Sequence, residues 1–270
     1  MRPLDAFLVP WRHRRLIARL ARREIAARYR GSMLGPLWAL AAPLATLAIY
    51  SFAFGTVMRS RIPSGAGGGE GGAPFALVLF VGLVLFQVFA ETVSAAPSLV
   101  RNNATYVKQI VFPLEILPVV SLVAALFNAA VGTVVLLAFS MVFVGLPPLG
   151  ALWLPLVFVP AAMFALGAAW FLAGAGVFVR DLAQTVGIVC TALLFTSTTF
   201  FALDAVPDRM RPLVALNPTT TLVDAARSAL FAGTAPAWGP LLLCVAAALV
   251  AMLAGYLFFS RVRPGFADVA

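Results

Sequence analysis

The feature that most constrains this chain is a 64-residue window, 116–179, that contains no charged residue. A helix needs about 20 apolar residues to cross the hydrocarbon core of a membrane, so this window is long enough for two crossings. The motif Gly145-Leu-Pro-Pro-Leu-Gly150 divides it, because proline and glycine interrupt helices. Only 11% of the residues are charged, whereas soluble domains carry about 25%. We therefore expect an all-α integral membrane protein.

Further uncharged windows indicate six transmembrane helices in one membrane domain that covers residues 1–270. The spans are expected near residues 33–58, 74–97, 116–144, 151–179, 182–203 and 237–260. An even number of spans puts both termini on one side of the membrane, and fourteen of the nineteen lysines and arginines then share that side. The positive-inside rule places this side, and both termini, in the cytoplasm.

The segment before the first span is basic and amphipathic. On a helical wheel, six arginines lie opposite five apolar residues: Arg12, Arg15, Arg19, Arg22, Arg23 and Arg30 against Leu16, Ile17, Leu20, Ala21 and Ile25. This pattern predicts an interface helix over residues 11–30, with Arg12, Arg15 and Arg19 as candidates for binding anionic lipid headgroups. Glu24 and Arg28 lie four residues apart within the apolar arc and can pair. A segment that only fixes topology is the plainer alternative.

The connection at residues 98–118 lies on the side of the termini and is polar in its middle. Asn102 and Asn103 can cap a short helix that starts near Ala104. A short exposed helix between two spans would suit a cytoplasmic partner, and an ordinary loop is an equally good interpretation.

The connection at residues 204–236 lies on the outer side and contains apolar pieces that are too short to cross the membrane. Pro218 can start a helix just after Asn217, with Asp224 and Arg227 three residues apart on it. We expect a re-entrant helical hairpin between spans five and six that dips into the outer leaflet. Irregular backbone at that depth is tolerated only where protein or a water-filled cavity surrounds it, which suggests a conduit nearby.

The chain offers little catalytic chemistry. Lys108 is its only lysine, so no GxxxxGK[ST] phosphate-binding loop exists, and His13 is its only histidine. We expect no catalytic residue, no metal site and no cofactor in this chain. The charges cluster at the ends of apolar runs, which argues against nucleic acid as a partner.

The spans are expected to lack mid-membrane charges, because Glu91, Glu115 and the pair Arg180-Asp181 are interpreted as span ends. Proton- or ion-coupled transporters usually keep ionisable groups at mid-membrane, so any energy for transport is expected to come from a partner. The apolar spans show no clear polar stripe.

Aromatic residues are frequent in the spans, and their faces suit the stacking of sugar rings. The channel-lining candidates are Tyr50, Phe54, Trp170, Phe200 and Phe201. Small residues at positions 167, 174 and 176 permit close helix packing or dimerisation.

Several short motifs, in order along the chain, resemble the permeases of ABC-2 type transporters, and more narrowly their polysaccharide-export branch (O-antigen, capsule and teichoic acid). They are Glu24 with Arg28-Tyr-Arg-Gly-Ser32, Leu34-Gly35, Trp38 and Pro43; Asn103, Tyr106-Val-Lys108, Val111-Phe-Pro113 and Leu117-Pro118; Arg180-Asp181; Asn217-Pro218; and Phe266-Ala-Asp268. Late in span five the family often has Ser-Pro-Ile, whereas this chain has Phe195-Thr-Ser-Thr-Thr-Phe-Phe201, which weakens assignment to a particular glycan class.

The resemblance implies a homodimer in the bacterial cytoplasmic (inner) membrane, with two separate ABC ATP-binding subunits that hold ATP and Mg. It places the docking of those subunits on the interface helix and the short inner helix, through Glu24, Arg28, Asn103, Tyr106 and Lys108. The substrate would be a lipid-linked glycan that leaves the cytoplasm. Alternatives are an ABC-2 exporter of a drug or lipid, a membrane-embedded lipid transferase, and a passive channel.

Overall fold

The computed structural model describes residues 5–33, 35–53, 75–103, 112–201, 203 and 206–266, and every regular element in these ranges is helical. The candidates Phe54, Tyr106 and Lys108, and the helix expected to start near Ala104, lie outside the described residues.

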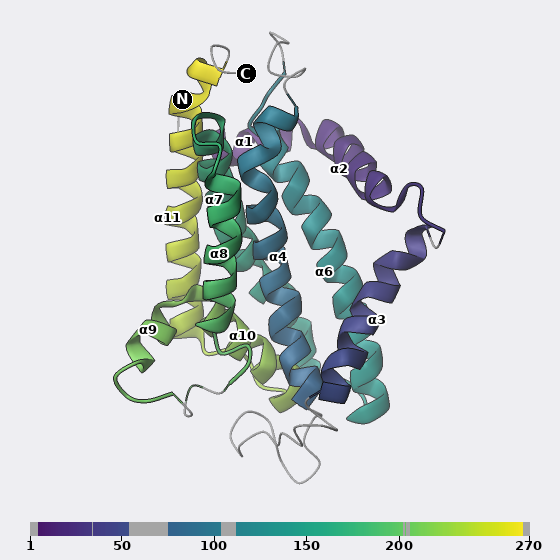
Figure 1. Ribbon diagram of the computed structural model, residues 1–270. Coiled ribbons are helices and arrows are strands. Elements are labelled where there is room, and N and C mark those ends of the chain that lie inside the picture. The colour runs from purple at the N-terminus through teal and green to yellow at the C-terminus, as the bar shows by residue number, and fades with distance from the viewer. Residues whose placement is uncertain are drawn as a thin grey trace.

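Within the described ranges, four helices are long and apolar enough to cross a membrane (Figure 1). They are α4 (Phe75–Asn102), α6 (Ile116–Phe143), α7 (Leu154–Phe178), which follows the short helix η3 (Leu149–Trp153), and α11 (Trp238–Val262). A charged residue or a proline marks the start of two of them, since α6 begins after Glu115 and α7 carries Pro155 in its first turn. Helix α4 continues five residues beyond the expected end of its span.

Two further apolar helices are shorter: α3 (Trp38–Tyr50) with 13 residues and α8 (Leu182–Phe195) with 14 residues. A helix rises about 1.5 Å per residue, so α8 is about 21 Å long against a hydrocarbon core of about 30 Å. The chain leaves α8 eight residues before the expected end of span five. The count of six complete spans therefore stays a prediction.

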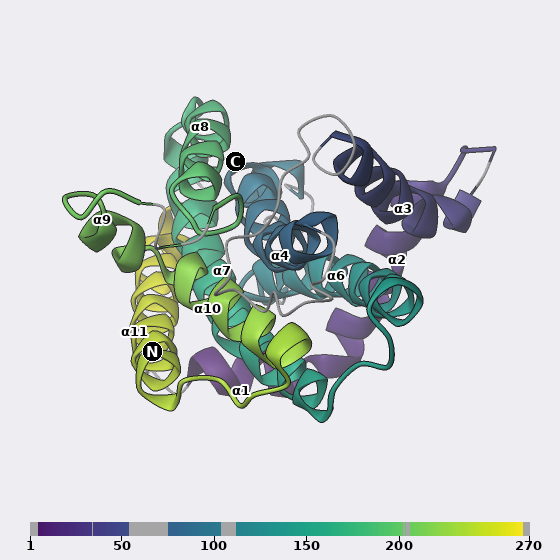
Figure 2. The same cartoon turned by 90° about the horizontal axis from the view of Figure 1, so that it is seen from below.

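The interface helix is present as two pieces, α1 (Asp5–Arg12) and α2 (Arg14–Tyr29), with a break at His13. Helix α1 lies at the same end of the bundle as the end of α11, while α2 slopes away over α6 and α3 returns along the same side (Figures 1 and 2). The short helices α9 (Arg211–Leu216) and α10 (Pro218–Arg227) lie at the opposite end, where α10 crosses the ends of α4 and α7 and continues as a π-helical turn, Ser228–Ala232.

Helix α7 is the centre of the bundle because its glycines admit neighbouring backbones. A Cβ atom at Gly167 would lie 2.6 Å from the carbonyl oxygen of Ala251 in α11, and one at Gly176 would lie 2.3 Å from that of Pro97 in α4. No Cβ fits at either distance, so both contacts require glycine. The expected close packing at these positions is therefore confirmed within one chain.

Candidate docking and conduit sites

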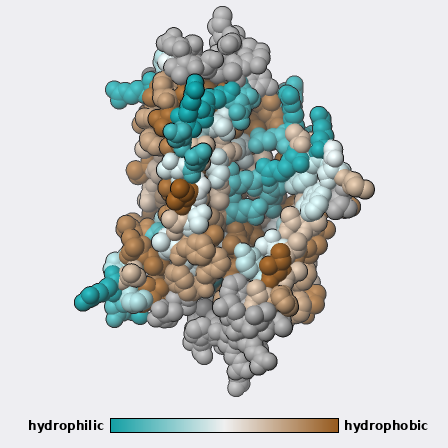
Figure 3. Space-filling model, viewed as in Figure 1, coloured by the Kyte–Doolittle hydropathy of each residue, from teal (hydrophilic) through white to brown (hydrophobic). Residues whose placement is uncertain are grey.

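The basic arc of the interface helix has the predicted orientation. Ile17 and Ala21 of α2 are buried, whereas Arg15 and Arg19 are exposed, and so is Arg12 at the end of α1. Hydrophilic side chains accordingly cover the α2 side of the surface in Figure 3. The arrangement leaves the three arginines accessible to anionic headgroups, and that role stays a prediction.

A polar cluster ties the end of α2 to two long helices. Arg28 forms an ion pair with Glu91 of α4, and Asn128 Nδ2 of α6 donates hydrogen bonds of 2.9 and 3.0 Å to the two Glu91 oxygens. The Tyr29 hydroxyl completes the cluster by donating to Asn128 Oδ1 at 3.2 Å. We call Arg28, Tyr29, Glu91 and Asn128 the α2 anchor.

The α2 anchor corrects two expectations. Glu91 lies well inside α4, sixteen residues after Phe75, and is not at the end of a span. Arg28 forms its ion pair with Glu91, whereas the sequence suggested Glu24. Glu24 is half-buried nearby, and burial raises its pKa, with Arg28 opposing and Glu91 reinforcing that shift. Asn128 was not among the predicted site residues, and no local pattern singles it out in an apolar run.

A second polar contact joins three helices at the end of the bundle near the termini. Glu115, with a side chain only 2% exposed, pairs with Arg263 just beyond α11. The carbonyl of Glu115 accepts a 2.9 Å hydrogen bond from the Trp170 indole, which also packs edge-to-face on Tyr256. Trp170 is fully buried by these contacts and has no side-chain surface free for a passing ligand.

Asn103, a predicted docking residue, lies directly after α4. Its side-chain amide donates a 2.8 Å hydrogen bond to the carbonyl of Leu99, so it closes the last turn of α4. Asn102 is the last residue of α4, and the capping of a following helix by Asn102 and Asn103 stays a prediction because that helix lies outside the described residues.

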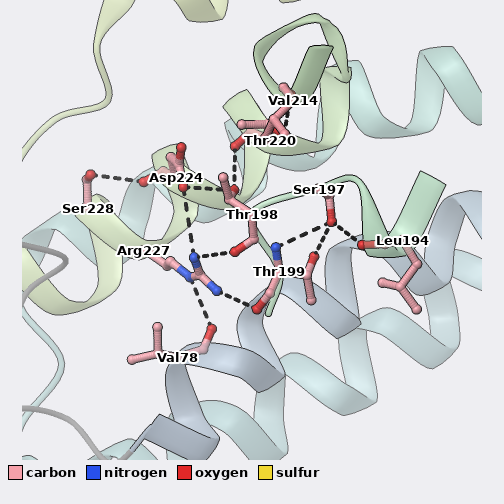
Figure 4. A network of polar contacts seen from close by, with 10 residues as sticks. All are labelled: Val78, Leu194, Ser197, Thr198, Thr199, Val214, Thr220, Asp224, Arg227 and Ser228. Atoms are coloured by element: carbon pink, nitrogen blue, oxygen red, sulfur yellow. Dashed lines mark hydrogen bonds and ion pairs between the residues drawn. The ribbon is translucent and has the colours of Figure 1, made fainter. Parts of the chain in front are cut away.

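At the opposite end of the bundle, Arg227 of α10 is the centre of a buried network (Figure 4). Its guanidinium donates to three backbone carbonyls, Thr198 at 2.7 Å, Thr199 at 2.8 Å and Val78 at 3.2 Å. Asp224 lies 3.9 Å from Arg227 and accepts a 3.0 Å hydrogen bond from the Thr198 hydroxyl. Arg227 thus supplies hydrogen-bond donors to backbone carbonyls just after the end of α8, where no N–H group of a continuing helix is available.

The predicted start of a helix at Pro218, just after Asn217, is confirmed. The Asn217 side chain accepts a hydrogen bond from the amide of Thr219 and so caps α10, with Pro218 in the first turn. The same side chain donates to the Leu193 carbonyl at 2.9 Å, which fastens the hairpin to α8. The expectation that this segment dips into the outer leaflet stays a prediction.

The remaining aromatic candidates lie in two places, just after α8 and at the end of α3. Phe200 stacks on Phe195 with ring centroids 5.1 Å apart, just after α8, and Phe201 next to it is half-buried. Tyr50 is half-buried at the end of α3. Their role in lining a channel stays a prediction.

The fold and its contacts define a class: a multi-pass helical membrane protein whose basic interface helix is tied to its spans by polar side chains. Residues 15–231 match the ABC-2 type transporter family, and the chain belongs to that family. The O-antigen export system permease protein RfbA of Myxococcus xanthus is 27% identical over 260 residues, 96% of each chain. Two proteins of the same description from Klebsiella pneumoniae are each 26% identical, over 220 and 209 residues, 81% and 77% of each chain.

Proposed function

We propose that this chain is the transmembrane subunit of an ATP-driven exporter that moves a lipid-linked, O-antigen-like polysaccharide out of the cytoplasm across the bacterial inner membrane. The observation that carries the proposal is the likeness to an O-antigen export permease over 260 residues. The membership of the ABC-2 type transporter family supports the transporter class.

The working unit is two copies of this chain with two ABC ATP-binding subunits, which bind ATP and Mg. Those subunits dock on α2 and on the connection after α4, which includes Asn103. The α2 anchor supports mechanical coupling, because Arg28 and Tyr29 on α2 contact side chains well inside α4 and α6. A tilt of α2 on ATP binding therefore moves both helices rather than bending a loop.

The cargo enters from the cytoplasmic end, where both termini lie. Arg12, Arg15 and Arg19 bind the anionic headgroup, in particular the pyrophosphate of a lipid carrier, since all three are exposed on the interface helix. The polymer passes between the two copies, with Tyr50, Phe54, Phe200 and Phe201 as candidates for stacking on sugar rings.

Reconstitution tests the proposal directly. The chain and its ATP-binding subunit are placed in proteoliposomes that carry undecaprenyl-pyrophosphate-linked polysaccharide on the outer face, and glycan protected inside the vesicles is measured. We expect protection to require ATP and to disappear when the Walker lysine of the ATP-binding subunit is changed to alanine. ATP-dependent movement of a drug or a free lipid with no movement of glycan would overturn the proposed substrate.

A further inference from the structure

The expectation that the spans show no polar stripe is wrong for α4, because four polar residues follow one face of this helix. Gln87, Glu91, Ser94 and Ser98 are spaced by four, three and four residues, so they fall within an arc of about 60° at 100° per residue. Gln87 and Ser94 are exposed, and Glu91 and Ser98 are half-buried. We call these four residues the α4 polar stripe.

The polar stripe borders three other helices. Ser94 contacts the Cys190 sulfur of α8 at 4.0 Å on one side, while Glu91 contacts Arg28 of α2 and Asn128 of α6 on the other. Figure 3 shows hydrophilic surface in the region between α2 and α4, in the half of the molecule nearer the termini. The polar face is therefore continuous with the basic interface helix.

The depth of the stripe is what makes it informative. At about 1.5 Å per residue, Glu91 lies about 16 Å and Gln87 about 22 Å from the end of α4 at Asn102. Placing an ionisable side chain at the centre of a membrane helix costs about 2.5–3.5 kcal/mol on insertion scales, so such residues face water or protein rather than lipid. A stripe that starts at the cytoplasmic end and reaches mid-membrane has the shape of an entry path.

The chemistry of the stripe suits a polyhydroxylated ligand. A carboxylate has about four acceptor positions. Arg28 and the two hydrogen bonds from Asn128 account for three interactions at Glu91, so acceptor capacity remains. Gln87 adds an amide that both donates and accepts, and the serines add hydroxyls. Such short, mixed donors and acceptors bind sugar hydroxyls without selecting one residue of a repeating polymer.

We propose that the α4 polar stripe lines a water-filled entrance in the assembled transporter and binds the hydroxyl groups of the glycan as it enters. The inference rests on the proposed export of a polysaccharide. It assigns the contact at the entrance to polar residues of α4, in addition to the stacking proposed for the aromatic candidates. In this arrangement Glu91 serves two roles, because it holds α2 in place and presents its remaining acceptor positions to the entrance.

Cysteine accessibility in the complex with the ATP-binding subunit tests the water-filled entrance. In a background with Cys190→Ala and Cys244→Ala, the variants Gln87→Cys and Ser98→Cys are treated with a membrane-impermeant maleimide in inside-out vesicles. Val134→Cys is the matched control, because Val134 is 63% exposed on α6 but surrounded by an apolar sequence. We expect Gln87→Cys to react at least about tenfold faster than Val134→Cys.

Equal rates for Gln87→Cys and Val134→Cys would overturn the entrance. Spontaneous disulfide formation between two copies of Gln87→Cys would instead assign the stripe to a contact between subunits and would also overturn the proposal. Neither outcome depends on which substrate is exported, so the failure of the entrance is distinguishable from a failure of the proposed function.

A second measurement tests the glycan contact. Gln87→Leu keeps a side chain of similar volume without hydrogen-bonding groups, and we expect at least fivefold slower glycan export in the proteoliposome assay, with partial recovery in Gln87→Asn. Thr133→Val on α6 lies off the stripe and should export normally. Co-purification with the ATP-binding subunit verifies assembly of each variant. Normal export by an assembled Gln87→Leu transporter would contradict the glycan contact even if position 87 is water-accessible.

Discussion

Arg227 supplies several hydrogen-bond donors at the point where the chain leaves α8. Its three carbonyl partners come from α4 and from the turn after α8, so one side chain connects three segments. A guanidinium fits this task because its donors form a planar fork, which an ammonium group lacks. Position 227 therefore requires arginine. In the sequence Arg227 counts only as one of the charges on the outer side, which does not reveal this requirement.

Replacing Arg227 by methionine is expected to destabilise the protein by about 3 kcal/mol, because the carbonyls of Thr198 and Thr199 lose a charged donor inside the fold. Thermal unfolding of the detergent-solubilised protein measures the effect, with Arg227→Lys expected to recover only part of it. The exposed Arg209 in the same outer region provides the control, since Arg209→Met should change the midpoint little. Similar midpoints for Arg227→Met and Arg209→Met would contradict this account.

The pair Arg28–Glu91 allows a charge exchange. Each single reversal, Arg28→Glu or Glu91→Arg, places like charges together, whereas the double variant restores opposite charges in reversed order. Because the two side chains are 39% and 18% exposed, solvent screening reduces the coupling to about 1 kcal/mol. The midpoints of unfolding of the four proteins give the coupling energy, and strictly additive effects would show that the ion pair holds nothing together.

At the scale of elements, the contact between α7 and α11 depends on the absence of a side chain. Gly167→Ala would push a methyl group against the backbone of Ala251 and Met252, so we expect a loss of about 1–3 kcal/mol and a lower unfolding midpoint. Gly187→Ala on α8 is the matched control, because beyond its own helical backbone no atom lies within 4 Å of the added carbon. That variant should be neutral or slightly stabilised, since alanine favours helix over glycine by about 1 kcal/mol.

The basic arc of the interface helix supports a different kind of prediction. Arg15→Glu combined with Arg19→Glu leaves the buried Ile17 and Ala21 untouched, so folding and assembly with the ATP-binding subunit should survive. We expect at least fivefold slower export, because the reversed charges repel the anionic headgroup. Co-purification and the proteoliposome assay are measured on the same preparations. Export at the normal rate would exclude a headgroup role for these arginines.

The sequence predicted the long helices well where residues close to a helix end mark that end. Helices α6, α7 and α11 begin or end within about two residues of charges, prolines or glycines that mark the boundaries. Glu91 was misplaced because the same rule treats every charge as a boundary. Its partners Arg28 and Asn128 are 63 and 37 residues away, and no window-based pattern contains contacts between such distant positions. The early end of α8 was missed for the same reason. The carbonyls just after α8 accept hydrogen bonds from Arg227 of α10, and this contact also joins positions too far apart for a local pattern.

At the scale of the whole molecule, the beginning of α1 and the end of α11 lie at one end of the bundle, and helices α9 and α10 lie at the other (Figure 1). We expect reporter domains fused to the two termini to lie both in the cytoplasm. A cysteine introduced at Arg209, beside the outer hairpin, should react with an impermeant maleimide only from the periplasmic side. Termini on opposite sides would require an odd number of crossings and would exclude the six-span topology.

The contact between Arg227 and the carbonyl of Val78 joins positions that are 149 residues apart. Ribosomes make α4 long before α10, so the nascent chain carries the unsatisfied carbonyls after α8 until the hairpin emerges. Synthesis of residue 227, and not insertion of α4 or α8 alone, is therefore what closes this end of the bundle. A chain truncated before residue 227 would leave the carbonyls of Thr198 and Thr199 without these donors, so we expect its unfolding midpoint to lie below that of the full chain.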